Sequence, residues 1–193
     1  MTLWLVRHAR PLVAPGVCYG ASDVAVDAVH THAVAQQLAT HLPHRIGLLS
    51  SPAQRCVQLA QQLQMLRPDL VCHVDARLAE MDFGRWEGVP WEQIPRSELD
   101  AWSGNFAHYR FGGVESASEV MWRVAQAWDD YMALTAAQGT ALLWVTHAGV
   151  LRAASLLARG VRQVREATDW PACAFPYGAC WQLRGTELMA LPV

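Results

Sequence analysis

The stretch Leu3-Trp4-Leu5-Val6-Arg7-His8 decides the expected fold. Four consecutive apolar residues, Leu3 to Val6, are typical of a central strand that is buried on both faces, and the run ends abruptly at Arg7 and His8. A second apolar run, Ala141 to Val145, also ends close to a histidine, His147. Both strands are therefore expected to present polar side chains at their carboxyl ends.

Between these two runs, strand patterns alternate with helix patterns. Such alternation is typical of a parallel sheet with helices on both faces. Ser51 and Pro52 predict the N-cap and the first position of one of the helices. We expect a three-layer α/β/α sandwich with a mostly parallel central sheet. The predicted strands are 3–6, 46–50, 71–74 and 140–146, the predicted helices are about 26–41, 53–66, 116–137 and 148–158, and a hairpin is predicted for 180–183 with 188–191.

Residues 81–115 interrupt the alternation with many Gly, Pro and Trp residues, which predicts a cap or lid over the strand ends. With this insertion, residues 1–193 are expected to form a single domain. Five tryptophans suggest either an aromatic surface for a substrate or, as the commoner arrangement, packing of the cap. They stand at positions 86, 91, 102, 122 and 128.

The composition argues against several classes of protein. The net charge is −2, and all fifteen basic residues are Arg with no basic run, so nucleic-acid binding is not expected. Five cysteines without a C-x-x-C pattern favour neither a disulfide framework nor a cysteine zinc site. No basic leader and no apolar run near the roughly 18 residues of a membrane span are visible, so we expect a cytoplasmic protein without a membrane partner.

Polar residues gather where the predicted strands end, and ligands of open α/β sheets bind there. Phosphoryl transfer needs an in-line nucleophile, cations on the phosphoryl oxygens and a proton for the leaving group, which His, Arg and Glu can supply. A histidine attacks through one ring nitrogen when an acceptor, commonly a backbone carbonyl, holds the other. The candidates at this edge are Arg7, His8, Arg55, Glu80 and His147.

Some neighbouring residues leave alternatives open. Arg10 either contacts the substrate or pairs with a carboxylate, and Asp82 is a rival to Glu80 as the acid. Four histidines invite a zinc site, but apart from Asp27 that helix lacks the expected acids and thiolates, so surface histidines are favoured. They are His30, His32, His41 and His44.

Five sequence blocks, taken in order, resemble the histidine phosphatase superfamily, the phosphoglycerate-mutase-like enzymes, over nearly the whole chain. The blocks are Leu5-Val6-Arg7-His8-Ala9-Arg10-Pro11; Ser50-Ser51-Pro52-Ala53-Gln54-Arg55-Cys56; Arg77-Leu78-Ala79-Glu80 with Gly84-Arg85-Trp86-Glu87-Gly88; Gly113-Val114-Glu115-Ser116; and Val145-Thr146-His147-Ala148-Gly149-Val150-Leu151-Arg152.

This resemblance implies a role for each matched position. His8 becomes a transient phosphohistidine, and Glu80 protonates the leaving group and later activates water, which requires Glu80 to be protonated in the free enzyme. No metal and no cofactor are required. The implied ligands of the substrate phosphate are Arg7, Arg55 and His147, with Arg10 as a further candidate.

A narrower likeness concerns the stretch Gly16-Val17-Cys18-Tyr19-Gly20-Ala21-Ser22-Asp23 and the block around Glu80, which look most like the α-ribazole phosphatase branch of cobalamin synthesis. Three positions depart from the family pattern. Ala9 and Val114 replace glycines. The added methyl of Ala9 either crowds the pocket beside His8 or, if the φ of Ala9 is negative, is harmless. Ala14 stands where the mutases place an Asn on the phosphate, which argues against mutase chemistry.

The expected function is therefore metal-independent hydrolysis of a small phosphomonoester, the partner being that small molecule. Three alternatives remain: a phosphoglycerate-type mutase, a protein-phosphohistidine phosphatase, and an inactive module that binds a phosphorylated ligand. The length of the 81–115 insertion argues against the second, and the presence of both a nucleophile and an acid argues against the third. An apolar C-terminal hairpin would permit a homodimer.

Overall fold

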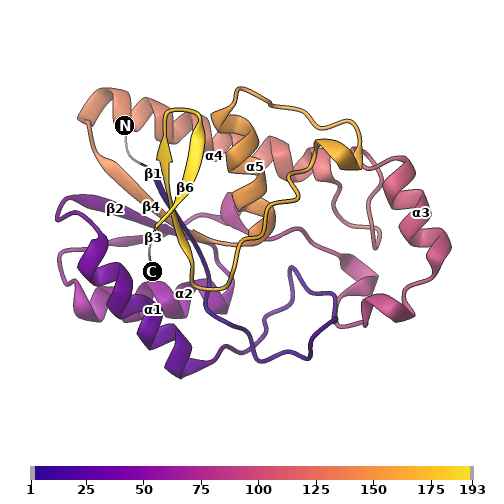
Figure 1. Ribbon diagram of the computed structural model, residues 1–193, viewed down its shortest axis with the longest axis horizontal. Helices are drawn as coiled ribbons and strands as arrows, with labels where there is room; N and C mark the ends of the chain where they lie inside the picture. Colours follow the sequence, from indigo (N-terminus) through magenta and orange to yellow (C-terminus); the bar gives the residue numbers. More distant parts are fainter. Residues whose placement is uncertain (1–2, 192–193) are drawn as a thin grey trace.

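The computed structural model describes residues 3–191 and contains a six-stranded sheet in the order β3-β2-β4-β1-β5-β6 (Figure 1). The first four strands in this order are mutually parallel, and β5 and β6 are added antiparallel at one edge. The predicted mostly parallel sheet and the hairpin are thereby confirmed. The strands are β1 (Leu3–Arg7), β2 (Ile46–Ser50), β3 (Cys72–Val74), β4 (Ala141–Thr146), β5 (Cys180–Arg184) and β6 (Glu187–Ala190).

Helices cover both faces of the sheet, which makes the three predicted layers. In Figure 1, α1 and α2 lie below the sheet and α4 and α5 above it, while α3 lies at the right of the view, away from the strands. The predicted helix boundaries are correct to within two residues. The helices are α1 (Ala28–His41), α2 (Gln54–Leu66), α3 (Arg96–Gly104), α4 (Ala117–Gln138) and α5 (Ala148–Ala158). None of the helices within residues 3–191 has the length and apolar character that crossing a bilayer demands.

The first strand is buried on both faces because its side chains alternate between two cores. Leu3 and Leu5 pack in the core between the sheet and helices α4 and α5, whereas Trp4 and Val6 pack in the core between the sheet and helices α1 and α2. Four apolar residues in a row are therefore required here, since a polar side chain on either face would enter a core.

The predicted N-cap of the second helix is wrong. Ala53 occupies the N-cap position of α2, and the first helical N–H, that of Gln54, is accepted by Asp23 Oδ1 at 2.8 Å. Ser51 and Pro52 precede the helix. The Ser51 hydroxyl contacts His147 Nε2 at 2.7 Å, so this side chain serves the strand-end site.

The cap holds an aromatic stack, and the five tryptophans do not form one cluster. Trp91 and Trp102 stack at an interplanar angle of 10° and both lie against Phe111. Trp128 instead packs with Trp144 of β4 in the domain core, and Trp122 is 66% exposed on α4. Helical spacing thus brought Trp128 to the core and left Trp122 outside.

The sheet register brings three strand ends to one place. Arg7 pairs with Thr146 of β4, and Ser50 of β2 pairs with Val145. Residues that follow β1, β2 and β4 consequently emerge side by side at the carboxyl edge.

Candidate active site

All six residues expected at the site line one cavity of about 620 Å³ at the carboxyl edge of the sheet. The cap contributes Phe83 and Trp91 to its wall, and the loop after β1 contributes Ala14. The expected residues that the structure brings together are Arg7, His8, Arg10, Arg55, Glu80 and His147.

His8 follows β1 directly and is 1% exposed. Its Nδ1 lies 2.7 Å from the carbonyl oxygen of Ala9. Because a carbonyl oxygen only accepts hydrogen bonds, Nδ1 carries the proton and Nε2 carries the lone pair. Nε2 has no hydrogen-bond partner among residues 3–191, so this lone pair is available in the cavity.

The departure from the family pattern at Ala9 causes no backbone strain. Within the described part of the chain only glycines have a positive φ, so Ala9 has the negative φ that suits a side chain. Its side chain is fully buried.

Arg7 is held at this site by neutral groups. Its Nη1 donates to the carbonyl oxygen of Phe175 at 2.6 Å, and its guanidinium lies over the ring of Tyr177, 3.8 Å from the ring centre. Its Nε is buried and has no hydrogen-bond partner among the described residues. Tyr177 also reaches Tyr19, with 2.7 Å between the two hydroxyl oxygens.

Arg55 is fully buried in the first turn of α2 and makes no ion pair with a carboxylate among residues 3–191. Its Nη1 donates to the carbonyl oxygen of Ser22 at 2.7 Å, and Nη2 donates to the carbonyl oxygen of Gly20. A buried cation without a counter-charge is unfavourable by several kcal/mol. An anion in this cavity would remove that penalty.

Glu87 fixes the loop that supplies those two carbonyls. Its carboxylate accepts N–H bonds from Gly20, Ala21 and Ser22 at 2.9 to 3.1 Å, and from Phe83 at 3.0 Å. Burial by itself would raise the pKa of Glu87, but these hydrogen bonds outweigh it and hold the pKa below its usual value. Glu87 therefore ties the loop before α1 to the cap.

His147 follows β4 and is also fully buried, with its ring centre 5.1 Å from that of His8. Arg55 Nε donates to His147 Nδ1 at 3.3 Å, so the proton of His147 lies on Nε2 and points at the Ser51 hydroxyl. Both ring nitrogens are thus engaged with protein groups. A phosphoryl oxygen receives the Nε2–H only in competition with Ser51.

The pKa values of both histidines are lowered. For His8, burial lowers the pKa to about 3, and the positive charges of Arg55 and Arg7 act in the same direction. For His147, burial is again the main cause of a pKa well below the usual 6.5, with His8 and Arg55 adding to it. Both rings are neutral near pH 7, as a nucleophilic imidazole requires.

Glu80 faces the same cavity from the loop after β3. Its Oε2 accepts the N–H of Gly149 and its Oε1 accepts its neighbour Met81 N–H, each at 3.1 Å. A Cβ at position 149 would lie 2.1 Å from Glu80 Oε1, so only glycine leaves room for this carboxylate.

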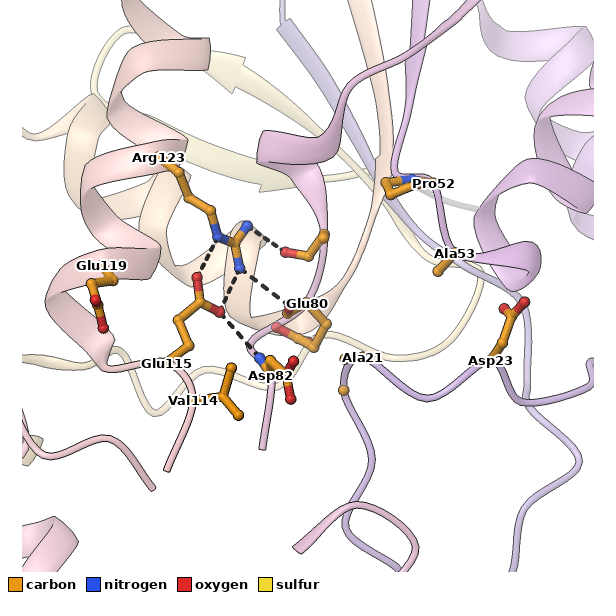
Figure 2. A pocket seen from close by; sticks show the side chains of 12 residues that line it. Ala21, Asp23, Pro52, Ala53, Glu80, Asp82, Val114, Glu115, Glu119 and Arg123 are labelled. Atoms are coloured by element: carbon orange, nitrogen blue, oxygen red, sulfur yellow. Dashed lines mark hydrogen bonds and ion pairs between the residues drawn. The ribbon is translucent and has the colours of Figure 1, made fainter. Parts of the chain in front are cut away.

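Arg123 of α4 positions the Glu80 loop. Figure 2 shows its guanidinium bound to the Glu115 carboxylate and donating to backbone carbonyls of the loop. The distance between Arg123 Nε and Glu115 Oε1 is 2.7 Å. Those carbonyls include Ala79 at 2.6 Å and Glu80 at 3.2 Å. The rival acid, Asp82, accepts from Gly84 N at 2.8 Å and lines a neighbouring hollow instead of the cavity of His8.

Arg10 and His30 contact each other beside the site. Arg10 is exposed at the cavity and forms no ion pair within residues 3–191. Its backbone N–H donates to His30 Nδ1 at 2.9 Å, so His30 supports the loop after β1. Among the described residues, no three His, Cys, Asp or Glu side chains are grouped so as to hold a metal ion.

Sequence reasoning missed several residues that shape this site: Tyr19, Ser51, Glu87, Arg123 and Tyr177. Ser51 lies in the same sequence block as Arg55, and Glu87 directly follows Trp86 in another block. Their membership of these blocks was the signal that could have identified them. Tyr177 lies in a Pro- and Gly-containing loop before β5, where no pattern indicated a contact with Arg7.

The lowered pKa of His8 predicts a pH dependence of stability. An unfolded His8 takes up a proton near pH 6.5, whereas the folded one resists it until about pH 3, so acid favours the unfolded state between these values. The free energy of unfolding should therefore fall as the pH decreases from 6 to 4. His8→Gln should show a slope smaller by about 1.4 kcal/mol per pH unit.

Urea unfolding at a series of pH values measures these slopes. His32→Gln, at an exposed position of α1, controls for the loss of a histidine elsewhere. Parallel curves for the wild-type and His8→Gln chains would contradict the buried, neutral state of His8.

Several solved structures are similar to this chain in fold. TTHB049 from Thermus thermophilus is 25% identical, with a TM-score of 0.73 and 100% of each chain covered. The mycobacterial glucosyl-3-phosphoglycerate phosphatase Rv2419c has a TM-score of 0.76 over 98% of this chain and 96% of its own, and at 22% identity it shows the fold alone. No curated protein matches the sequence.

A model of one family matches residues 3–172, which is most of the chain. The same residues contain the five sequence blocks and all six side chains of the cavity. The chain therefore belongs to the histidine phosphatase superfamily, branch 1.

Proposed function

We propose that this protein hydrolyses a small phosphomonoester through a phosphohistidine at His8, without a metal ion. One observation carries the proposal: the neutral His8 ring has its Nδ1–H fixed on the Ala9 carbonyl oxygen, and its unpartnered Nε2 lies in a cavity that four arginines line, Arg7 and Arg55 among them. Membership of the histidine phosphatase superfamily supports an activity of the phosphatase or mutase type.

Arg55 and Arg7 keep N–H donors that a phosphoryl group could bind. Three of the five N–H groups of Arg55 are used by His147, Ser22 and Gly20, and two remain for phosphoryl oxygens. The buried, unpartnered Nε of Arg7 is a further donor that an oxyanion would satisfy. Preorganised donors of this kind stabilise the negative charge that develops on the oxygens bound to phosphorus in the transition state.

In the first step, His8 Nε2 attacks phosphorus and the bond from phosphorus to the ester oxygen breaks. Glu80 gives its proton to the departing oxygen, so the alcohol leaves neutral. In the second step, Glu80 takes a proton from water as the water oxygen attacks phosphorus and the bond to Nε2 breaks. Phosphate is released, and His8 and Glu80 return to their starting states.

The proposed substrate is α-ribazole 5′-phosphate, because the stretch Gly16 to Asp23 resembles that branch of the family. We also propose that the enzyme acts in the cytoplasm as a hydrolase of cobalamin synthesis. Ala14 lines the cavity where a mutase would place an Asn, which favours release of free phosphate over its return to the substrate. Analysis of the products separates these outcomes, since a mutase yields a phosphate isomer.

Phosphate release from p-nitrophenyl phosphate in excess EDTA tests the proposal. The wild-type chain should retain its activity in EDTA, and His8→Ala should fall to the background rate because the nucleophile is missing. His32→Ala, which removes an exposed histidine, is the matched control and should keep full activity. Loss of activity in EDTA, or an active His8→Ala chain, would overturn the metal-free phosphohistidine route.

The role of Glu80 predicts a dependence on the leaving group. Glu80→Gln should lower kcat/KM for an alkyl phosphate by about 10²- to 10⁴-fold, the usual contribution of a general acid. The loss for p-nitrophenyl phosphate should be much smaller, because p-nitrophenolate leaves without a proton. The ratio kcat/KM reports the first phosphoryl transfer, so the later attack by water does not obscure the comparison.

Gly149→Ala provides a second route to the same result. Its Cβ would displace the Glu80 carboxylate from the Gly149 N–H, so the alkyl ester should again suffer more than the aryl ester. Equal losses on the two esters would assign the leaving-group proton to another residue.

A further inference from the structure

We propose that a second cavity, under the cap, is the leaving-group subsite and receives an uncharged aromatic ring. This inference rests on the proposed function, since it concerns the alcohol that leaves phosphorus in the first step. The cavity measures about 350 Å³, and sites for small molecules span roughly 300–1,000 Å³. We call it the aromatic cavity, after the main residues of its wall, which are Phe83, Trp91, Trp102, Phe106 and Trp170.

The aromatic cavity continues the cavity of His8 on the side of Glu80. Both cavities are lined by Glu80, Phe83, Trp91 and Arg152. A phosphate ester with phosphorus at His8 has its ester oxygen near the acid that protonates it. The carbon side of that ester therefore extends past Glu80, where the aromatic cavity begins.

The other hollow beside Glu80 has the wrong charge for a phosphate ester. It measures about 610 Å³, and Figure 2 shows carboxylates around it, among them Asp23, Asp82 and Glu119. Its one arginine, Arg123, is already paired with Glu115. Glu119 is paired with Arg110, but Asp23 and Asp82 have no ion-pair partner among the described residues. This acidic hollow shares only Glu80 with the cavity of His8, so a leaving group placed there would meet the negative charge of these two carboxylates.

The wall of the aromatic cavity determines the class of leaving group. Trp102 stacks on Phe106 at 28°, and Phe106 lies 5.9 Å from Trp170 between ring centres. Trp102 Nε1 is a buried donor without a partner among the described residues, but the five rings carry no acceptor. Hydroxyl or carboxylate groups buried among them would lose most of their hydrogen bonds to water, whereas a ring would pack on them. Arg152 lies at the boundary between the two cavities. Its Nε–H donates to the carbonyl oxygen of Pro171, and its Nη2–H donates to that of Cys173.

A matched pair of esters tests this subsite by binding alone. 3-Phenylpropyl phosphate and n-propyl phosphate have the same phosphate and the same primary ester, and they differ by one phenyl group. Titration calorimetry on the His8→Ala chain measures both dissociation constants without turnover. Burial of a phenyl group should make the first ester bind about 10- to 100-fold more tightly.

Variants show where the phenyl group sits. Trp170→Ala should remove most of the difference between the two esters, and Ala117→Leu should do the same by filling the cavity from the first turn of α4. Trp122→Ala, at an exposed position of the same helix, is the control and should leave the ratio unchanged. Equal binding of the two esters, or a ratio that survives both cavity variants, would overturn the proposal.

Turnover by the wild-type chain separates this proposal from the proposed function. If the binding ratio holds but neither ester releases phosphate, the subsite stands and the hydrolytic function fails. If both esters release phosphate and bind equally, the function stands and the aromatic subsite is wrong.

Discussion

The hydrogen bond from His8 Nδ1 to the carbonyl oxygen of Ala9 determines which ring nitrogen meets the substrate. It is 2.7 Å long and fully buried, so no water competes for the proton. Its geometry depends on the end of β1, which is held by the bond from His8 N to the Thr146 carbonyl oxygen of β4. The two cores on either side of β1 therefore hold the nucleophile in place as well.

The charges around His8 are arranged so that they remain available. Arg7 and Arg55 are held by backbone carbonyls, a tyrosine ring and a histidine nitrogen, whereas arginines farther from the site, such as Arg77 and Arg123, are paired with carboxylates. A phosphate dianion would supply the missing negative charge, and this gain offsets the desolvation of the buried cations. The same positive charges help to keep His8 neutral by lowering its pKa. Binding and nucleophilicity thus have one electrostatic origin.

Much of this arrangement could be predicted from the sequence, because it follows from where strands end. Apolar runs located β1 and β4, and the polar residues after them located His8 and His147. Contacts between loops could not be predicted in this way. The bonds from Glu87 to residues 20–22 and the stacking of Tyr177 on Arg7 join segments that lie far apart in the chain and carry no periodic pattern. Local preference predicts a helix cap at Ser51, but in the fold its hydroxyl contacts His147 instead.

The central claim is that His8 becomes covalently phosphorylated, and trapping the intermediate tests it most directly. Glu80→Gln should slow the attack of water more than the transfer from p-nitrophenyl phosphate, so the intermediate should accumulate in that variant. Rapid quenching in denaturing base, followed by mass spectrometry, should reveal one added phosphoryl group that is lost in acid and maps to His8. An unmodified chain during turnover, or a phosphoryl group on any other residue, would contradict the account.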